Sequence, residues 1–181
     1  MIMNDNKELK QRKATRLENF DYNSAGAYFI TICTQNRRQI LSHIVGVDVL
    51  DDPFGNLLNN PNHVKLSPLG KIADKYINQL SDFYESIKID RYVIMPNHIH
   101  LMLFVLDDGA SRTSPPTKQH SAVSRFISTF KRFCNKEYGE NIWQRHFNDH
   151  IIRNQKDYEE HIKYILENPI RWHYDELYSE E

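Results

Sequence analysis

The sequence predicts a single α+β domain with a mainly antiparallel sheet and helices packed on one face. With 181 residues, the chain has the usual length of one domain and can bury a sizeable core. Apolar runs with period two alternate with amphipathic helical stretches in a βαββαβα-like order, and there is no internal repeat. This order is typical of an antiparallel sheet with helices segregated to one side.

The first half of the chain supplies the opening strands and one helix. Residues 27–35 are strongly apolar and predict a strand, and residues 38–47 predict a second extended segment. Residues 51–62, rich in Asp, Asn, Pro and Gly, have the composition of a loop. Ser67 is an N-cap followed by proline at the first helical position, so a helix is expected from there to about Phe83.

The second half supplies a hairpin, two helices and a short strand. The hairpin spans residues 92–105, and residues 107–119, with Gly, Ser and paired Pro, predict a loop. A helical stripe occupies residues 121–137, and residues 147–152 form a short strand. The last helix begins after the N-cap Asn154 and ends near residue 168, because the following proline disfavours helical geometry there.

The hairpin is the most informative segment. Met95-Pro96-Asn97 predicts the turn, since proline presets the first central position and asparagine tolerates the second. Side chains alternate along a strand, so His98, His100 and Met102 share the face opposite the core side chains of Ile99, Leu101, Leu103 and Val105. Two neutral imidazoles at this spacing can bind one divalent metal. Several unrelated metal enzymes use His-x-His, so the pair alone does not identify a reaction.

The last helix offers a tyrosine and an amide beside its apolar stripe. Tyr164 lies outside the stripe, and Asn168 follows one turn later on the same side. His161 falls on this side too and is a candidate to assist the tyrosine. Tyr158 belongs to the stripe, with Ile162, Ile165 and Leu166.

Composition limits the class of protein and its location. No apolar run approaches the ~20 residues that cross a bilayer, and the polar first residues are not a secretory signal. Cys33 and Cys134 are expected to be reduced core thiols. We therefore expect a cytoplasmic protein without a membrane partner.

The net charge of −1 gives no global argument for nucleic-acid binding. Locally, the charged residues of helix 121–137 are basic up to Glu137 and include Arg125, Lys131 and Arg132. A face of one sign suits a phosphate backbone, although a charged helix face is often only solvated.

Taken together, these motifs resemble the HUH-type single-tyrosine transposases, and most closely their REP-associated branch. The combination of Met-Pro-Asn-His-Ile-His with a Tyr-x-x-x-Asn-Pro helix is specific for a chain of this size. The matching segments extend through nearly the whole sequence: Ala27–Arg37, Tyr92–His100, Trp143–Arg145, Asp149–Asn154 and Tyr164–Pro169. Asn168 favours the REP-associated branch, since insertion-sequence members often have glutamine there.

The resemblance implies a ferredoxin-like or RNA-recognition-like sheet and a site made of four residues. Tyr164 would be the nucleophile, and His98, His100 and Asn168 would be the ligands of a divalent metal, Mg²⁺ or Mn²⁺. Zn²⁺ or Ni²⁺ could bind as well without being the working ion. Residues 26–169 would form the transposase domain, with an N-terminal extension at residues 1–25 and a peripheral tail at residues 170–181.

The implied reaction is cutting and rejoining of single-stranded DNA near hairpins through a 5′-phosphotyrosine. Arg145 and Trp143 match the family's Trp-Gln-Arg pattern and are candidates for DNA contact, with core packing as the alternative for Trp143. The expected partner is single-stranded or hairpin DNA, bound by a homodimer or a monomer. Three other functions stay open: an HUH replication initiator or relaxase, a catalytically silent hairpin-binding protein, and a hydrolytic His-x-His enzyme acting on a small molecule.

Overall fold

A computed structural model describes residues 24–45, 64–106 and 121–179 of the chain. Its elements, in chain order, are β1 (Gly26–Cys33), the 3-10 turn η1 (Gln35–Arg37), β2 (Ser42–Ile44), β3 (Val64–Leu66), α1 (Pro68–Phe83), β4 (Ile87–Ile94), β5 (His98–Val105), α2 (Ala122–Tyr138), β6 (Asn148–Ile152), α3 (Gln155–Glu167) and the 3-10 turn η4 (Trp172–Tyr174). No helix in these ranges is long and apolar enough to cross a membrane.

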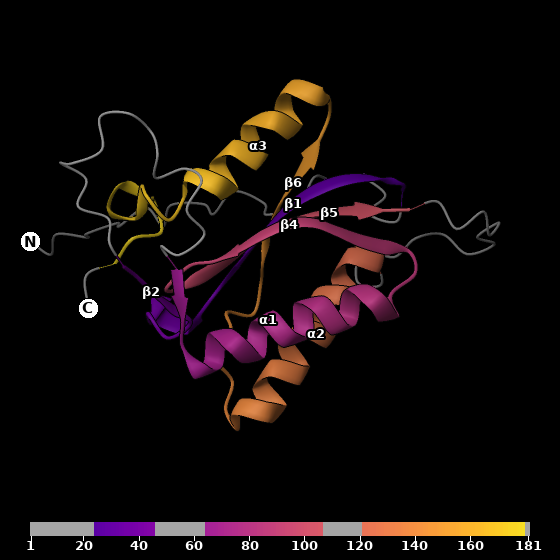
Figure 1. Cartoon of the computed structure of the whole chain (residues 1–181). Helices are drawn as coiled ribbons and strands as arrows, with labels where there is room; N and C mark the ends of the chain where they lie inside the picture. Colours follow the sequence, from indigo (N-terminus) through magenta and orange to yellow (C-terminus); the bar gives the residue numbers. More distant parts are fainter. Residues whose placement is uncertain (1–23, 46–63, 107–120, 180–181) are drawn as a thin grey trace, which may run out of the picture.

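The main sheet has four antiparallel strands in the order β4-β5-β1-β6 (Figure 1). With the short β2–β3 hairpin set aside, the chain runs strand, helix, two strands, helix, strand. In this order, β5 of the histidine hairpin pairs with β1, β4 lies outside β5 at one edge, and the last strand, β6, pairs with the other side of β1. The α+β class and the ferredoxin-like arrangement predicted from the sequence are confirmed.

The two faces of the sheet have different cores. Helices α1 and α2 cover one face, and Ile30, Ile99 and Leu101 are buried beneath them. Helix α3 crosses the opposite face (Figure 1) and buries Ile165 against Phe29 and Met102. The prediction that all helices pack on one face of the sheet is therefore wrong for α3, which packs on the other face. The histidine face also presents large apolar side chains, and α3 removes them from water.

The local sequence signals predicted most element boundaries. The hydroxyl of Ser67 accepts a hydrogen bond from the Gly70 amide at 3.0 Å, which caps α1 at the predicted position. The predicted turn between β4 and β5 is closed by a hydrogen bond from Met95 N to His98 O at 2.8 Å. The second extended segment is shorter than predicted, since only Ser42–Ile44 pairs, with the unpredicted strand β3.

The segment after Pro169 was expected to be peripheral, but it packs against the rest of the domain. Trp172 is 4% exposed, and its ring lies 5.8 Å from that of His98. The Asn97 side-chain amide donates to the carbonyl oxygen of Leu177 at 2.8 Å, so this segment also holds the turn before the histidines. The loops predicted at residues 51–62 and 107–119, and most of the predicted N-terminal extension, lie outside the described residues.

Candidate metal centre and nucleophile

Both histidines of β5 are buried, with exposed fractions of 0% for His98 and 2% for His100, and their ring centroids are 4.4 Å apart. His98 Nδ1 contacts the side-chain oxygen of Asn97 at 2.8 Å. An amide oxygen only accepts, so this nitrogen donates and Nε2 of His98 keeps its lone pair. His100 Nδ1 is hydrogen-bonded to the hydroxyl of Thr31 at 2.9 Å. Such contacts orient imidazoles for metal binding through the other nitrogen.

Helix α3 brings Tyr164 and Asn168 to the same place. The Tyr164 ring lies 5.1 Å from the His100 ring, and 40% of the tyrosine is exposed. Asn168 is 2% exposed. The phenol of Tyr164 donates to Asp175 Oδ2 at 2.8 Å, and the amide nitrogen of Asn168 donates to the same oxygen. The structure thus unites the four predicted residues with a fifth, Asp175.

The electrostatics of the site favour neutral side chains. Burial lowers the pKa of His98 to about 3, with Arg37 acting in the same direction and Asn168 opposing it. Burial, and then the neighbouring His98, lower the pKa of His100 well below its usual range. Burial, and then the hydrogen bond to Asp175, raise the pKa of Tyr164. Neutral imidazoles are the form that binds a metal.

The donor atoms of this site fit a divalent metal. Among the described residues, His98 Nε2, His100 Nε2 and Asn168 Oδ1 are all buried and lack a hydrogen-bond partner. Buried polar atoms normally have partners, because desolvation without compensation costs about 1–3 kcal/mol for each group. A carboxylate oxygen of Asp175 also lies within 4.8 Å of ligand atoms of both histidines. Two imidazoles with amide and carboxylate oxygens form a mixed set suited to several divalent ions.

Asp175 was missed by the sequence analysis. It lies beyond the helix that holds Tyr164, in a segment without regular periodicity, and only the tertiary fold returns it to the site. His161 lines the same open pocket as His100 and Tyr164, and its Nδ1 contacts the carbonyl oxygen of Asp157 at 2.8 Å.

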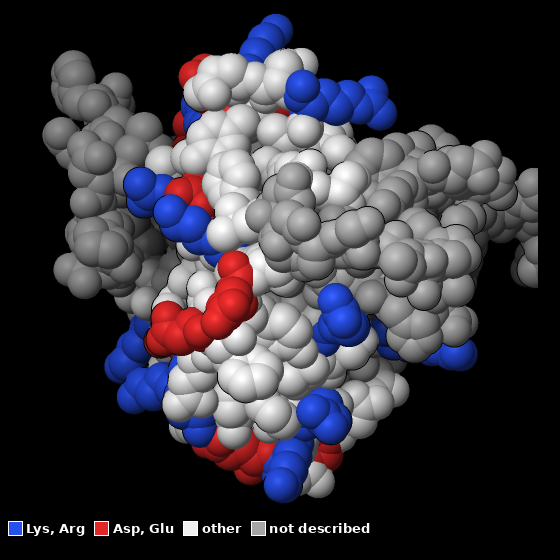
Figure 2. All heavy atoms as spheres, turned by 90° about the vertical axis from the view of Figure 1, so that its right-hand side faces the viewer, with Lys and Arg blue, Asp and Glu red and all other residues white. Residues whose placement is uncertain are grey.

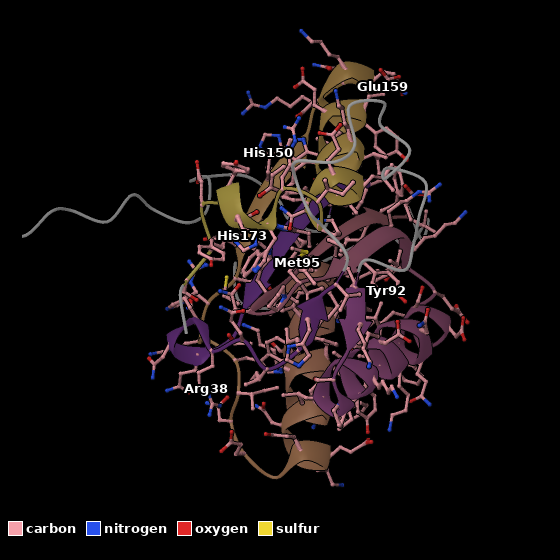
Figure 3. The ribbon with its side chains drawn as sticks, turned by 60° about the vertical axis from the view of Figure 1, so that its left-hand side comes forward. Arg38, Tyr92, Met95, His150, Glu159 and His173 are labelled. Atoms are coloured by element: carbon pink, nitrogen blue, oxygen red, sulfur yellow. The ribbon has the colours of Figure 1, made fainter. Side chains whose placement is uncertain are left out.

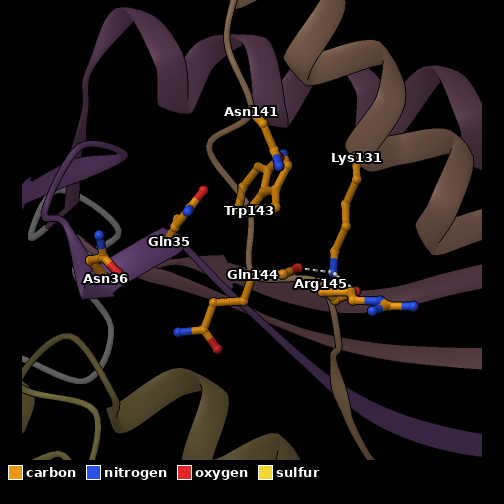
Figure 4. Close-up of a pocket in the computed structure, with 7 residues that line it drawn as sticks. All are labelled: Gln35, Asn36, Lys131, Asn141, Trp143, Gln144 and Arg145. Carbon is orange, nitrogen blue, oxygen red and sulfur yellow. Dashed lines mark hydrogen bonds between the residues drawn. The ribbon is translucent and has the colours of Figure 1, made fainter.

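The predicted DNA-binding residues lie on α2 and on the loop before β6. Arg125, Arg132 and Arg145 are exposed. The ammonium of Lys131 donates instead to the carbonyl oxygen of Gln144 at 2.8 Å (Figure 4). It also donates to the carbonyl oxygen of His146 at 3.1 Å. Burial lowers the pKa of Lys131 to about 8, so this side chain stabilises the loop more than it offers charge to a ligand.

Trp143 lies in the core. It is 2% exposed, and its ring is 5.4 Å from that of Phe130. Core packing, the alternative interpretation of this tryptophan, is therefore the one that its burial favours. Gln35, Asn36, Gln144 and Arg145 surround the open pocket beside it (Figure 4).

The described surface has no single basic face in the view of Figure 2, where Lys and Arg stand in separate groups between acidic residues. This distribution agrees with the net charge of −1. The charges on this face therefore do not by themselves indicate a nucleic-acid surface.

Comparisons with known proteins agree with the architecture. No family model matches the chain. An uncharacterized protein of Haemophilus influenzae is 27% identical over 188 residues, covering 96% of both chains. The REP-associated tyrosine transposase of Escherichia coli is 34% identical over 84 residues, covering 46% of this chain and 45% of that protein. The solved structure of a REP-associated tyrosine transposase bound to a REP hairpin has a TM-score of 0.56, with 23% identity, over 88% of this chain and 76% of that one.

The fold of this chain is that of a solved REP-associated tyrosine transposase, a single domain with a four-stranded antiparallel sheet and three helices. Parts of the sequence are similar to proteins named as REP-associated tyrosine transposases of Escherichia coli and, putatively, of Haemophilus influenzae. The alignment with the E. coli protein spans less than half of that protein's length.

Proposed function

We propose that this protein cuts and rejoins single-stranded DNA near hairpins, with Tyr164 as the nucleophile and His98, His100 and Asn168 as metal ligands. The strongest support is that the three predicted ligands each have a buried donor atom without a partner in the described structure. The related solved structure contains a REP hairpin, which supports hairpin DNA as the substrate. The expected setting remains the cytoplasm, where such DNA is accessible.

In this proposal, Tyr164 would attack a phosphate held over the two histidines. Its oxygen would bond to phosphorus while the bond to the 3′ oxygen breaks, giving a 5′-phosphotyrosine and a free 3′-hydroxyl. The phenol proton has an acceptor in place, because Tyr164 already donates to Asp175. A divalent ion such as Mg²⁺ or Mn²⁺ would supply polarisation of the scissile phosphate when bound. The reverse attack by a 3′-hydroxyl would rejoin the strand without ATP.

Asp175 and Asn97 act as positioning residues in this proposal. Asp175 binds the amide nitrogen of Asn168, which turns Oδ1 of that amide away from Asp175 and leaves it unpaired. The side-chain oxygen of Asn97 fixes the orientation of the His98 ring. A site with such supports is ordered before a ligand arrives, so little ordering remains to be done on binding.

Cleavage should require both histidines. The substrate for this test is labelled single-stranded DNA from the flanks of the gene, incubated with the purified protein and Mn²⁺ or Mg²⁺. His98→Ala and His100→Ala should each lower the cleavage rate by more than about 100-fold, because even residues behind metal ligands typically contribute 10–100-fold. DNA affinity should largely survive, since phosphate contacts elsewhere provide most of it.

The matched control is His43→Ala, which alters an exposed histidine on β2 and should leave cleavage unchanged. Full cleavage in excess EDTA would refute the metal requirement. Tight hairpin binding without cleavage by the unaltered protein, with either ion, would instead identify a silent hairpin-binding protein.

The DNA is proposed to continue from the site around the β6 edge of the sheet towards α2. Strand β6 is an edge strand, and the loop before it contacts α2 through Lys131. The exposed Arg145 lies on this loop, and Arg125 and Arg132 lie on the helix. This path would add cationic contacts with the backbone, while the catalytic groups stay on the opposite face of the sheet.

The double variant Arg125→Gln/Arg132→Gln should weaken binding to all single strands alike. Each phosphate contact on a single strand changes the salt slope of log K by about 0.7, so the slope should fall by roughly 1.4. Fluorescence anisotropy at several salt concentrations measures this. The control Arg38→Gln removes an exposed arginine that is paired with Glu140 at 2.8 Å and should preserve the slope. An unchanged slope in the double variant would mean that the α2 face is only solvated.

A further inference from the structure

A second group of potential metal ligands lies between β6 and the first half of α3. It consists of His150, Asp157 and His161, each of which offers one ligand atom within 4.8 Å of the others. Figure 3 shows His150 beside α3, to which the other two residues belong. None of the three is among the proposed ligands of the catalytic metal, and their chemistry is not used in the proposed reaction.

The donor atoms are already close to the spacing of a metal site. His150 Nε2 is 2.9 Å from Asp157 Oδ1, and His161 Nδ1 is 3.2 Å from the same oxygen. In a tetrahedral zinc site with ligand distances of about 2.0–2.1 Å, neighbouring donor atoms are roughly 3.3 Å apart. Small movements of three side chains would therefore admit an ion.

The sequence fixes two of the ligands on one side of α3. Asp157 and His161 are four residues apart, one helical turn, so their side chains are neighbours. The third ligand comes from β6, where the ring of His150 stacks on the ring of His161 with a centroid distance of 4.5 Å and an interplanar angle of 17°. The imidazole ring of histidine is the commonest metal ligand among protein side chains.

Asp157 is held ionised and oriented by its surroundings. The backbone amide of Arg153 donates to Asp157 Oδ2 at 3.0 Å. This hydrogen bond, and next the contact with His150, lower the pKa of Asp157. The amide of Asp157 in turn donates to the capping side chain of Asn154 at 3.0 Å, which fixes its backbone at the start of α3.

We propose that His150, Asp157 and His161 form a second metal site, for a borderline transition-metal ion such as Zn²⁺. Two nitrogen ligands and one carboxylate suit Zn²⁺, Ni²⁺ or Co²⁺, whereas Mg²⁺ prefers oxygen ligands and retains its waters. The ion would replace the protons on His150 Nε2 and His161 Nδ1, and each neutral imidazole would then carry its single proton on its other ring nitrogen. The side chain of His150 is 45% exposed, so a water can complete the coordination.

Binding of an ion at this second site would affect the position of Tyr164, the proposed nucleophile. Tyr164 is three residues after His161 on the same helix. The ring of Phe29 lies between the two sites, 4.7 Å from the His161 ring and 5.0 Å from the His100 ring. An ion bound by both β6 and α3 would hold the helix against the sheet. An effect of this ion on cleavage rests on the proposed catalytic role of Tyr164, whereas binding of the ion does not.

Isothermal titration of the full chain with Zn²⁺ tests the site without any use of activity. The unaltered protein should bind two ions per chain. His150→Ala and His161→Ala should each lose one equivalent and retain the other, and the double variant His98→Ala/His100→Ala should also lose one. The control His173→Ala changes an exposed histidine outside both clusters and should still bind two.

Absorption spectroscopy with Co²⁺ is an independent measurement of binding at the same site. The visible absorption of Co²⁺ in the His98→Ala/His100→Ala background should indicate four-coordinate binding and disappear when His150→Ala is added. Circular dichroism confirms that each variant is folded. The proposal is overturned if His150→Ala and His161→Ala bind as many zinc ions as the unaltered chain. It is equally overturned if His98→Ala/His100→Ala removes all binding, and either result would leave the proposed catalytic centre intact.

Discussion

Tyr164→Phe should fold, bind metal and bind DNA, yet form no covalent adduct. The substitution removes only the phenol oxygen, which is the proposed attacking atom. It also removes the hydrogen bond to Asp175, whose cost of about 1 kcal/mol leaves the protein folded. The measurement is denaturing electrophoresis of the protein after incubation with labelled single-stranded DNA and Mn²⁺, in which the adduct is the only labelled protein species.

Tyr158→Phe is the matched control on the same helix. The Tyr158 hydroxyl donates to Asp90 Oδ2 at 2.6 Å, and its ring packs at the margin of the Phe29 core. Loss of this hydroxyl should cost about 1 kcal/mol of stability and preserve the adduct. Mass spectrometry of the trapped adduct decides the assignment, since a nucleotide attached to any residue other than Tyr164 contradicts it.

Acid should destabilise the metal-free protein through the two buried histidines. Both have lowered pKa values when folded, so between pH 7 and pH 5 they gain protons in the unfolded chain and stay neutral in the native one. The unfolded state is therefore favoured as the pH falls below about 6.5, the usual pKa of histidine. The contribution of His98 and His100 together should be a loss of about 4 kcal/mol at pH 5.

Urea unfolding in EDTA at the two pH values measures this loss. His98→Gln and His100→Gln should each reduce the difference between pH 7 and pH 5 by about 2 kcal/mol, because glutamine does not titrate. His43→Gln, at an exposed position, should leave the difference as it is. Equal acid sensitivity of all three variants and the unaltered chain would mean that the histidines are protonated inside the folded protein.

The sequence was sufficient for those parts of the structure that depend on local patterns. The alternation in β5 separates His98 and His100 from the core side chains, and the four-residue spacing in α3 places Tyr164 beside Asn168. The shared face of the two histidines and the neighbouring positions of Tyr164 and Asn168 follow from the strand and the helix alone, whatever the overall fold. The chemical roles proposed for these residues come from the resemblance, because no periodicity could provide them.

Other parts depend on contacts between distant segments. Strand β3 has three residues, too few for an alternation to stand out, and it forms only because β2 pairs with it. Asp175 belongs to no regular element, and its place beside Tyr164 follows from the burial of Trp172. The burial of Trp143 and the internal contacts of Lys131 also depend on how the loop before β6 packs.

The unpaired atoms of His98, His100 and Asn168 bear on how long the protein survives in a cell. Buried groups without partners lower the stability of the metal-free protein, and an ion that binds only the native state raises it by RT ln(1 + [L]/Kd). Proteases digest the transiently opened chain, whose population follows the free energy of unfolding. With the proposed metal site, metal-starved cells should therefore degrade this protein faster than metal-replete cells, and its abundance should follow the supply of the ion.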